Sequence, residues 1–190
     1  MRIIAGQFKG RKLFLPQGQD IRPTADKIRG AIFNALAAQN ALADSLVLDC
    51  FCGTGALGLE ALSRGARHAL FIDQNPVALD LARKNTALCQ AQTQAQFILA
   101  SLPVLAPMHD PAFKATLVFL DPPYRKGLIH PTIQALIAGS WLAPLCRIIL
   151  ESEKSCAAFM THDITVENEK IYGETKICFA RYTPSAVSCA

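Results

Sequence analysis

Short apolar runs alternate with amphipathic segments along most of the chain. The apolar runs predict five buried strands, at residues 46–49, 69–73, 97–100, 117–121 and 147–151. The segments between them carry apolar residues at helical spacing and predict helices at 56–64, 75–88 and 128–138. Strands that alternate with helices in this way are typical of a parallel α/β sheet with helices on both faces.

The two ends of the chain have different patterns. Residues 2–15 contain two short β-like runs separated by glycine and charge, and they predict a small hairpin outside the main sheet. Thr24 is a suitable N-cap for a helix that runs to about Ala38. Near the C-terminus, residues 164–168 and 175–181 flank Gly173 and predict a closing antiparallel hairpin. We expect a small N-terminal extension over 1–20 and one main domain over 21–190.

Composition places the chain among ordinary globular proteins. With 190 residues, of which 51% are hydrophobic and 18% charged, it can bury one good core. The seven cysteines form no C-x-x-C pair and their odd number cannot pair fully, so we expect reduced thiols, no metal site and a cytoplasmic location. A redox or nucleophilic role for Cys50 and Cys52 is a minor alternative. No signal-peptide core and no run of 18 apolar residues is present, so export and membrane insertion are not expected.

Positive charge is concentrated at the N-terminus. The net charge is +4, and residues 1–30 hold seven Lys and Arg residues against two Asp. This segment is therefore a candidate contact for a polyanion such as RNA. A solvated basic hairpin is the alternative. The candidate contacts within the hairpin are Arg2, Lys9, Arg11 and Lys12.

The stretch LDCFCGTGALG at residues 48–58 combines a strand end with a glycine loop. It matches G-x-G-x-x-G at the start of a predicted helix, and Asp73 ends the next strand twenty residues beyond Gly53. The glycines allow the backbone to approach a ligand, and the acid can accept hydrogen bonds from a ribose diol. The pattern fits either a dinucleotide or S-adenosylmethionine, with a tight structural turn as the further alternative.

Asp49 favours S-adenosylmethionine. An acid four residues before the first glycine would repel a pyrophosphate, whereas it could attract the amino group of a methionine moiety. The sulfonium cation of S-adenosylmethionine also favours carboxylates and aromatic faces, and Phe51 supplies such a face.

The stretch LVFLDPPYRKG at residues 117–127 ends a buried strand with an acid, two prolines and a tyrosine. The prolines have no N–H, and the residue before a proline is kept extended, so the turn offers a stiff set of acceptors. Asp121 and the carbonyl of Pro122 could accept the two hydrogens of an exocyclic amino group while Tyr124 stacks on the base. A proline-rich surface turn is the alternative.

These two loops meet if the first and fourth strands are neighbours, as they are in doubly wound sheets whose order reverses beside the first strand. The crevice would then hold a methyl donor and a nucleic-acid base. To reach it, the base must be unpaired or flipped out of its helix.

The chain resembles the RsmD family of bacterial 16S ribosomal RNA guanine-N2 methyltransferases over nearly its whole length. The blocks that carry the resemblance are RIIAGQFKGRKL, IRPTADKIRGAIFNAL, VLDCFCGTGALGLEALSRGA, FLDPPYRKG, WL at 141–142, LESE at 150–153, and EKIYGETKICFARY. The resemblance implies a seven-stranded class I methyltransferase sheet with an RNA-contacting N-terminal β extension. It also implies S-adenosylmethionine as cofactor and N2-methylguanine in the small-subunit ribosomal RNA as product. The substrate is expected within a small-subunit particle, and the enzyme as a monomer.

The resemblance also distributes roles over this chain. It places Asp49 and the glycine loop against the methionine part of the cofactor, and Asp73 against the ribose. The candidate cofactor residues are Asp49, Phe51, Cys52, Gly53, Thr54, Gly55, Asp73, Gln74 and Ser101; the candidate catalytic residues are Asp121, Pro122, Pro123 and Tyr124; and Arg22, Thr24 and Arg125 join the four hairpin residues as substrate contacts.

One position departs from the family pattern. Ala100 stands after the third strand, where the family usually has a polar residue that contacts adenine. We therefore expect the Ser101 backbone N–H and apolar contacts to hold the adenine.

Three other functions fit parts of the sequence. A dinucleotide-dependent oxidoreductase fits the glycine pattern but gives the DPPY turn no role. A non-catalytic RNA-binding protein would use only the basic N-terminus. An adenine-N6 methyltransferase acting on DNA or RNA would use the same DPPY chemistry.

Overall fold

The structure is a computed structural model that describes residues 1–16, 23–110, 112–156 and 161–184. The substrate-contact prediction for Arg22 lies outside these residues, and Thr24 is described only by its backbone. Helices and strands follow in the order α1 (Pro23–Ala38), β1 (Leu46–Cys50), α2 (Ala56–Ser63), β2 (His68–Asp73), α3 (Pro76–Cys89), a 3-10 turn η1 (Gln92–Gln94), β3 (Ala95–Leu99), β4 (Ala115–Leu120), α4 (Ile129–Ala138), β5 (Leu142–Glu153), β6 (Ile164–Tyr172) and β7 (Thr175–Tyr182).

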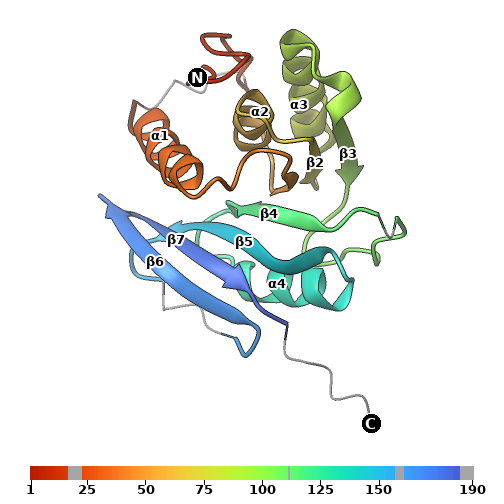
Figure 1. The fold of residues 1–190 in the computed structure, drawn as a ribbon, viewed down its shortest axis with the longest axis vertical. Coiled ribbons are helices and arrows are strands. Elements are labelled where there is room, and N and C mark those ends of the chain that lie inside the picture. Colours follow the sequence, from red (N-terminus) through yellow and green to blue (C-terminus); the bar gives the residue numbers. More distant parts are fainter. Residues whose placement is uncertain (17–22, 111, 157–160, 185–190) are drawn as a thin grey trace.

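One seven-stranded sheet forms the centre of the molecule, in the order β3-β2-β1-β4-β5-β7-β6 (Figure 1). The first five strands of that order are parallel, and β7 and β6 are antiparallel to their neighbours. The order reverses between β1 and β4, which pair directly from Val47↔Leu117 to Cys50↔Leu120. The predicted adjacency of the first and fourth strands is therefore confirmed, and it places a crevice at their carboxyl ends.

Alternate residues of the strands face two separate cores. Val47, Phe71 and Phe119 pack with α1, α2 and α3 on one face. Leu48, Ile72 and Val118 pack with α4 and Trp141 on the other. Figure 1 shows the same layers, with α1 to α3 above the sheet and α4 below it. Burial on both faces explains why these strands are continuous apolar runs.

Local signals place the helix that follows β2. Asn75 is the N-cap of α3, and its side chain accepts a hydrogen bond from Val77 N–H at 2.9 Å. Pro76 follows at the first helical position, where its missing N–H costs no hydrogen bond. The helix ends at Cys89, and the C-cap residue Gln90 adopts a left-handed conformation with φ 58°.

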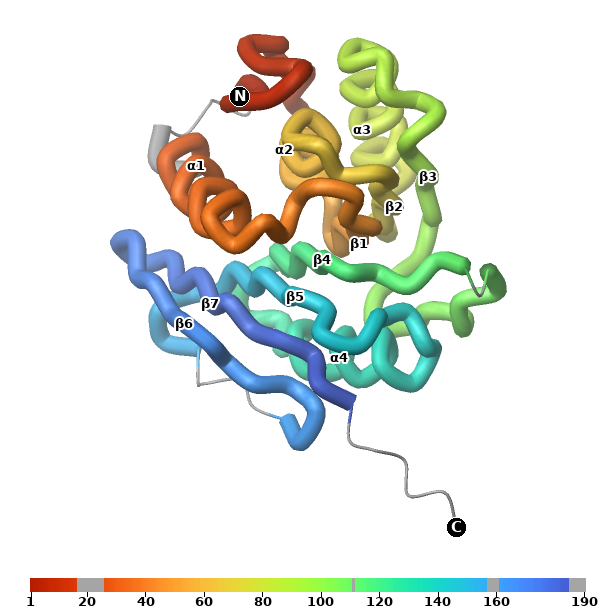
Figure 2. The backbone as a smooth tube through the Cα atoms, viewed as in Figure 1, coloured from red at the N-terminus to blue at the C-terminus, as the bar shows by residue number. Residues whose placement is uncertain are grey.

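The N-terminal segment forms less β structure than the sequence predicts. Its two arms form one isolated bridge, between Arg2 and Lys12, and Gly10 N–H donates to Ile3 O at 2.9 Å, while turns occupy most of the chain between them. Ile3, Phe8 and Leu13 instead pack into the same core as α1 and α2. Burial of these side chains against helices replaces the longer strand ladder. Figure 2 shows the segment lying over α2.

Hydrogen bonds fix this segment to α2. The Glu60 carboxylate is completely buried and accepts the backbone N–H groups of Ile4 at 2.7 Å and Ala5 at 3.1 Å. It also pairs with Arg64 at 2.7 Å. At Gly6 a Cβ would meet the Ser63 carbonyl oxygen at 1.8 Å, so only glycine allows this approach.

Candidate active site at the carboxyl edge of the sheet

The loop after β1 turns sharply into α2. Phe51, Gly53 and Gly55 have φ values of 61°, 53° and 76°. The loop is held by a hydrogen bond from Cys52 N–H to Ile72 O on the neighbouring strand, 3.0 Å long. A left-handed conformation is costly for an aromatic residue, so the surrounding structure must impose it on Phe51. The space where a Cβ of Gly53 would project is open, so a ligand can approach the backbone there.

Asp49 lies beneath this loop, at the end of β1, and is 1% exposed. Its Oδ2 accepts the backbone N–H of Gly58 at 2.8 Å, which fixes the side chain against α2. Burial raises the pKa of Asp49 to about 7, and the charge of Asp73 adds to the rise while the Gly58 hydrogen bond opposes it. A buried carboxylate of this kind favours a cationic partner.

Asp73 at the end of β2 supports the same loop. Its Oδ2 accepts Gly53 N–H and its Oδ1 accepts Asn75 N–H, both at 2.9 Å. Each oxygen keeps a further lone pair, which fits the predicted contact with a ribose diol. The residue therefore braces the glycine loop and remains available to a ligand.

The DPPY turn begins at the end of β4, beside this loop. Asp121 is exposed, and it lines a cavity at this edge of the sheet. Desolvation, with the nearby charges of Glu151 and Asp49, raises the pKa of Asp121. Among the described residues, none donates a hydrogen bond to its carboxylate.

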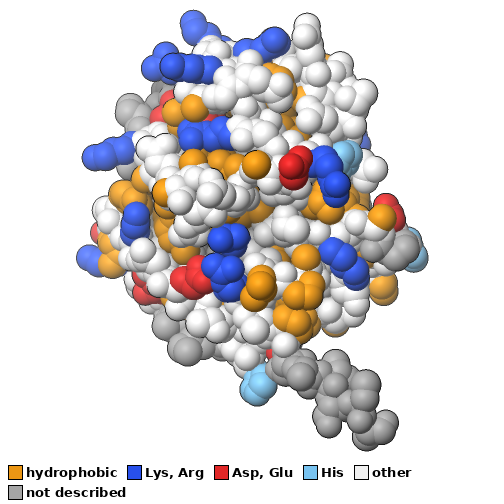
Figure 3. All heavy atoms as spheres, in the orientation of Figure 1, with side chains coloured by type: hydrophobic (Ala, Val, Ile, Leu, Met, Phe, Trp, Pro, Cys, Tyr) orange, Lys and Arg blue, Asp and Glu red, His pale blue; other side chains and the backbone are white. Residues whose placement is uncertain are grey.

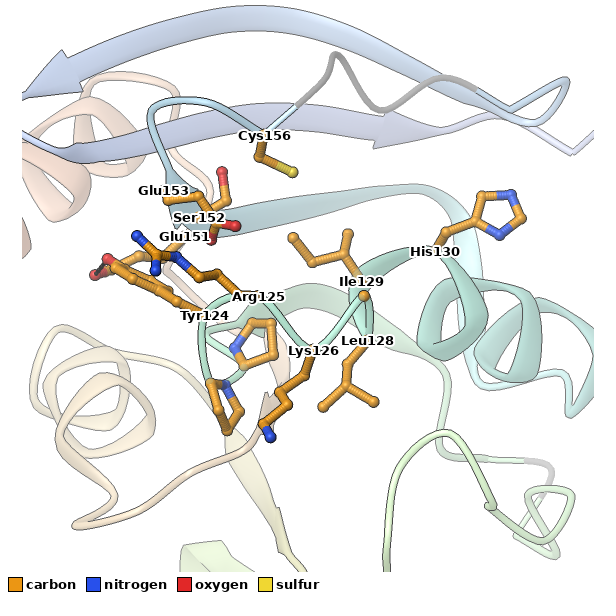
Figure 4. A pocket seen from close by; sticks show the side chains of 13 residues that line it. Tyr124, Arg125, Lys126, Leu128, Ile129, His130, Glu151, Ser152, Glu153 and Cys156 are labelled. Atoms are coloured by element: carbon orange, nitrogen blue, oxygen red, sulfur yellow. Dashed lines mark hydrogen bonds between the residues drawn. The ribbon is translucent and has the colours of Figure 1, made fainter.

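Tyr124 connects this turn to the end of β5 and the start of β7. Its hydroxyl donates to Glu151 Oε1 at 3.1 Å and lies 3.2 Å from Thr175 Oγ1. Figure 4 shows Tyr124 and Glu151 close together at one side of the cavity beyond the turn. Tyr124 is 41% exposed, so its ring can still offer a face to a base.

Two cavities meet at this edge. The first, of about 380 Å³, is lined by Asp49, Gly53, Thr54, Asp121 and Glu151, together with parts of α1 and α3. The second, of about 320 Å³, is lined by the turn from Pro122 to His130 and by the end of β5 (Figure 4). We call them the glycine-loop cavity and the DPPY cavity. The glycine-loop cavity brings Asp49 and Asp121 into one space.

Not every predicted cofactor residue lines the glycine-loop cavity. Phe51, Cys52, Gly53 and Thr54 line it, as does Asp49. The other four, Gly55, Asp73, Gln74 and Ser101, are absent from its lining.

Gly55, Gln74 and Ser101 serve the surrounding structure. A Cβ at Gly55 would come within 3.2 Å of Phe71 and Ala82, so this position packs α2 and α3 against β2. Gln74 and Ser101 form a hydrogen bond of 3.0 Å across the ends of β2 and β3. Among the described residues none accepts the Ser101 backbone N–H, which keeps it available for the predicted adenine contact.

The predicted RNA-contacting residues divide into two groups. Arg2, Lys9 and Lys12 are exposed, and Figure 3 shows Lys and Arg side chains gathered at the end of the molecule where the N-terminal segment lies. Arg11 is half-buried, donates to the carbonyl of Leu88 and lies over the Phe8 ring. Arg11 therefore anchors the segment to α3. Arg125 is exposed beside the DPPY cavity, and its φ is 61°.

The N-terminal segment also reaches the glycine loop. Asn85 on α3 donates to the backbone carbonyl of Thr54 at 2.9 Å, and its Oδ1 accepts Phe14 N–H at 2.7 Å. Met1 lines the glycine-loop cavity. Asn85 thus supports both the basic segment and the glycine loop.

Two residues that line the site are not among those predicted from the sequence. Glu151 lines both cavities, and Arg29 of α1 lines the glycine-loop cavity. Glu151 carries a signal that could have been used, because it is an acid at the carboxyl end of a buried strand, as are Asp49, Asp73 and Asp121. Arg29 has no such sequence signal, because a basic residue on a helix is usually exposed to solvent and does not line a buried site. Here it is 4% exposed and pairs with Asp26 at 3.2 Å.

The thiols beside the loop are buried. Cys50 and Cys52 are 0% and 7% exposed, and burial raises the pKa of both thiols. A thiol that stays protonated is a poor nucleophile, which disfavours the redox alternative.

Comparison with known proteins agrees with this geometry. A family model described as "Conserved hypothetical protein 95" matches residues 1–181. Ribosomal RNA small subunit methyltransferase D of Escherichia coli is 41% identical over 153 residues, which cover 80% of this chain and 75% of the relative. The chain belongs to the RsmD family.

Other family members and solved structures extend the agreement. Ribosomal RNA small subunit methyltransferase D of Haemophilus influenzae is 35% identical over 176 residues, covering 91% of this chain and 89% of the relative. The solved structure of the Escherichia coli protein yhhF has a TM-score of 0.82 at 34% identity and covers 97% of this chain and 99% of its own. The fold is that of the class I methyltransferases, and the predicted fold class is confirmed.

Proposed function

We propose that this protein transfers a methyl group from S-adenosylmethionine to the exocyclic N2 of one guanine in small-subunit ribosomal RNA. Membership of the RsmD family supports the reaction class and the RNA substrate. The observation that carries the proposal for this chain is that Asp49, Gly53 and Asp121 line one cavity. A methyl donor bound at the glycine loop and the amino group of a base bound at the DPPY turn would therefore face each other.

The residues of the glycine-loop cavity suit the cofactor. Asp49, Asp121 and Glu151 place three carboxylates around a space whose only cationic side chain, among the described residues that line it, is Arg29. Such a surround favours a ligand that carries an ammonium and a sulfonium group over one that carries a pyrophosphate. When bound, S-adenosylmethionine supplies a methyl carbon activated by the positive sulfur, which leaves as a neutral thioether.

Asp121 and the Pro122 carbonyl would act on the amino group. They accept its two N–H hydrogen bonds, which pyramidalises the nitrogen and aims its lone pair into the glycine-loop cavity. The methylated nitrogen must lose one proton, and the ionised Asp121 carboxylate, which accepts one of the amino hydrogens, would take it. Tyr124 would stack on the base once the base has left its helix.

One experiment tests the reaction directly. The protein is incubated with labelled S-adenosylmethionine and small-subunit ribosomal RNA from cells that lack it, as naked RNA and as assembled particles. We expect label in N2-methylguanosine, identified by mass spectrometry of the digested nucleosides. Label in N6-methyladenosine would favour the adenine enzyme, and no incorporation would favour a binding protein. Mapping the modified nucleotide in cells with and without the protein identifies the target.

The basic N-terminal segment supplies a second test. Arg2, Lys9 and Lys12 are exposed, so replacing all three with Gln should weaken RNA binding by about tenfold and reduce the slope of log affinity against log salt by about 2. Lys170→Gln on the edge strand β6 should leave the slope unchanged. An unaltered slope in the triple variant would mean that the segment is a solvated surface.

A further inference from the structure

Glu151 stands where the two cavities meet. It lines both the glycine-loop cavity and the DPPY cavity, and no other described residue lines both. A base whose amino group reaches from the DPPY turn toward the glycine loop must pass this carboxylate. Glu151 is therefore placed to contact the edge of the base that carries the reacting nitrogen.

Strand register fixes its position. Leu120 pairs with Leu150, so Glu151 of β5 lies level with Asp121, the residue that follows β4. On its other side, Glu151 pairs with Ile177 of β7. The two carboxylates are close enough for the charge of Glu151 to raise the pKa of Asp121.

Tyr124 orients the Glu151 side chain. Its hydroxyl occupies one lone pair of Oε1, and no other described residue donates a hydrogen bond to the carboxylate. An ionised carboxylate offers about four lone pairs, so acceptor sites remain open at the junction. Glu151 is half-buried, and desolvation raises its pKa, so it gains from a ligand that donates hydrogen bonds.

Guanine carries the matching donors. Its N1–H and its N2 amino group lie side by side on one edge of the base, whereas adenine has an unprotonated N1 beside its amino group. If Asp121 and the Pro122 carbonyl accept the two N2 hydrogens, N1–H is the next donor along that edge. A carboxylate opposite adenine N1 would instead bring two acceptors together.

We infer that Glu151 accepts the N1–H of the target guanine and thereby selects guanine over bases that lack this hydrogen. The inference rests on the proposed function and adds a specificity-determining residue to it. Tyr124 acts through Glu151 as a positioning residue, in addition to its predicted stacking. In this arrangement Asp121 accepts a hydrogen of the reacting nitrogen N2, and Glu151 accepts the hydrogen of the neighbouring ring nitrogen N1.

The test compares two substrates that share the reacting group. Small-subunit RNA is prepared with either guanine or 2-aminopurine at the mapped position. 2-Aminopurine keeps the 2-amino group but has an unprotonated N1. The wild-type enzyme should prefer guanine by at least about 100-fold in kcat/KM, because a site built for an N–H donor rejects a base without it.

Glu151→Gln is the decisive variant. Its amide can donate to the bare N1 of 2-aminopurine, so the preference for guanine should fall at least tenfold. The missing O6 of 2-aminopurine affects both enzymes alike and cancels in the comparison of the two ratios. A partly unfolded variant lowers both rates equally, so the ratio does not depend on the folded fraction.

Glu153→Gln is the matched control. Glu153 is two residues further along β5 and lines only the DPPY cavity, so this variant should keep the wild-type ratio. A ratio unchanged within about twofold in Glu151→Gln, or an equal change in Glu153→Gln, would overturn the inference while leaving the proposed function intact. Failure of the wild-type enzyme to methylate guanine would overturn both.

Discussion

The two loops that form the site are held together in different ways. In the glycine loop, Asp49 and Asp73 accept the backbone N–H groups of Gly58, Gly53 and Asn75. At the DPPY edge, Asp121 accepts no hydrogen bond from a described residue, and Glu151 accepts one from Tyr124. The carboxylates of the glycine loop are therefore hydrogen-bonded within the protein, whereas Asp121 and Glu151 at the DPPY edge keep acceptor sites for a ligand.

This difference indicates which substitutions should lower the free energy of unfolding and which should lower turnover. Removing a group that completes a scaffold exposes or strains buried atoms, so it should lower the free energy of unfolding. Removing an acceptor that has no partner within the protein should change the free energy of unfolding little. It should instead lower the rate of methyl transfer to the bound substrate. Substitutions in the glycine loop should therefore lower stability first, and substitutions in the DPPY turn should lower turnover first.

Asp121→Asn should have the largest effect. Asparagine keeps the shape but cannot take the proton from the amino group, so we expect turnover to fall at least about 100-fold. Binding of S-adenosylmethionine, measured by isothermal titration, should stay within about threefold of wild type, and the melting temperature should not fall. Asp80→Asn, in an exposed ion pair with Arg83, is the control for a neutralised surface acid. Near-normal turnover would remove Asp121 from the mechanism.

Gly58→Ala should affect stability first. A Cβ at this position would lie 2.4 Å from Phe71 Cε1 and 3.1 Å from Asp49 Oδ2, so α2 must shift away from β2. We expect a loss of about 2 kcal/mol in the free energy of unfolding by urea denaturation.

Gly30→Ala is the matched helical control, because the nearest atom to its added Cβ is Ile4 Cδ1 at 3.9 Å. Alanine in this open helical position should stabilise the protein by about 0.5–1 kcal/mol. Equal effects of the two substitutions would contradict a tightly packed glycine loop.

The last prediction concerns pH. Asp49 has a folded-state pKa of about 7, above its unfolded value, so the folded state binds its proton more tightly. Stability is then full below the unfolded pKa and declines as pH rises toward and through 7. Without cofactor, the melting temperature should fall by about 5 °C between pH 5 and pH 8 through this group.

Asp49→Asn should remove much of that decline, because its amide oxygen can still accept Gly58 N–H without a charge. Thermal unfolding of both proteins across the pH range provides the measurement. A decline that is the same in the variant would assign the pH dependence to other groups, with Asp121 and Glu151 as the first candidates because their pKa values are also raised.

Much of the fold follows from local sequence. Each predicted helix and strand of the main sheet is present, because burial on both faces makes strands into continuous apolar runs and caps such as Asn75 mark the helix starts. The largest difference is β5, which begins at Leu142 rather than at residue 147. Its early part pairs at Leu142 with Ala115 across a register shift, a contact that no local pattern contains.

The N-terminal segment shows the opposite case. Its alternating residues suit strands, yet Ile3, Phe8 and Leu13 are buried against helices that lie far away in sequence. Similarly, Arg11 was expected to be free for RNA, but the end of α3 offers it the Leu88 carbonyl. Local propensity cannot anticipate such partners, because they depend on which elements pack together.

The sequence by itself determined the chemistry of this protein, since an acid, a glycine loop and a DPPY turn at strand ends restrict both the cofactor and the type of nucleophile. Only the tertiary structure decided which groups share a cavity. Strand order brings Asp49, Asp121 and Glu151 together from three strands, and Glu151 gains its place from register with β4 and β7. The physical reason is that hydrogen-bonded pairing between strands, rather than any property of the residues alone, sets the distance between groups far apart in the chain.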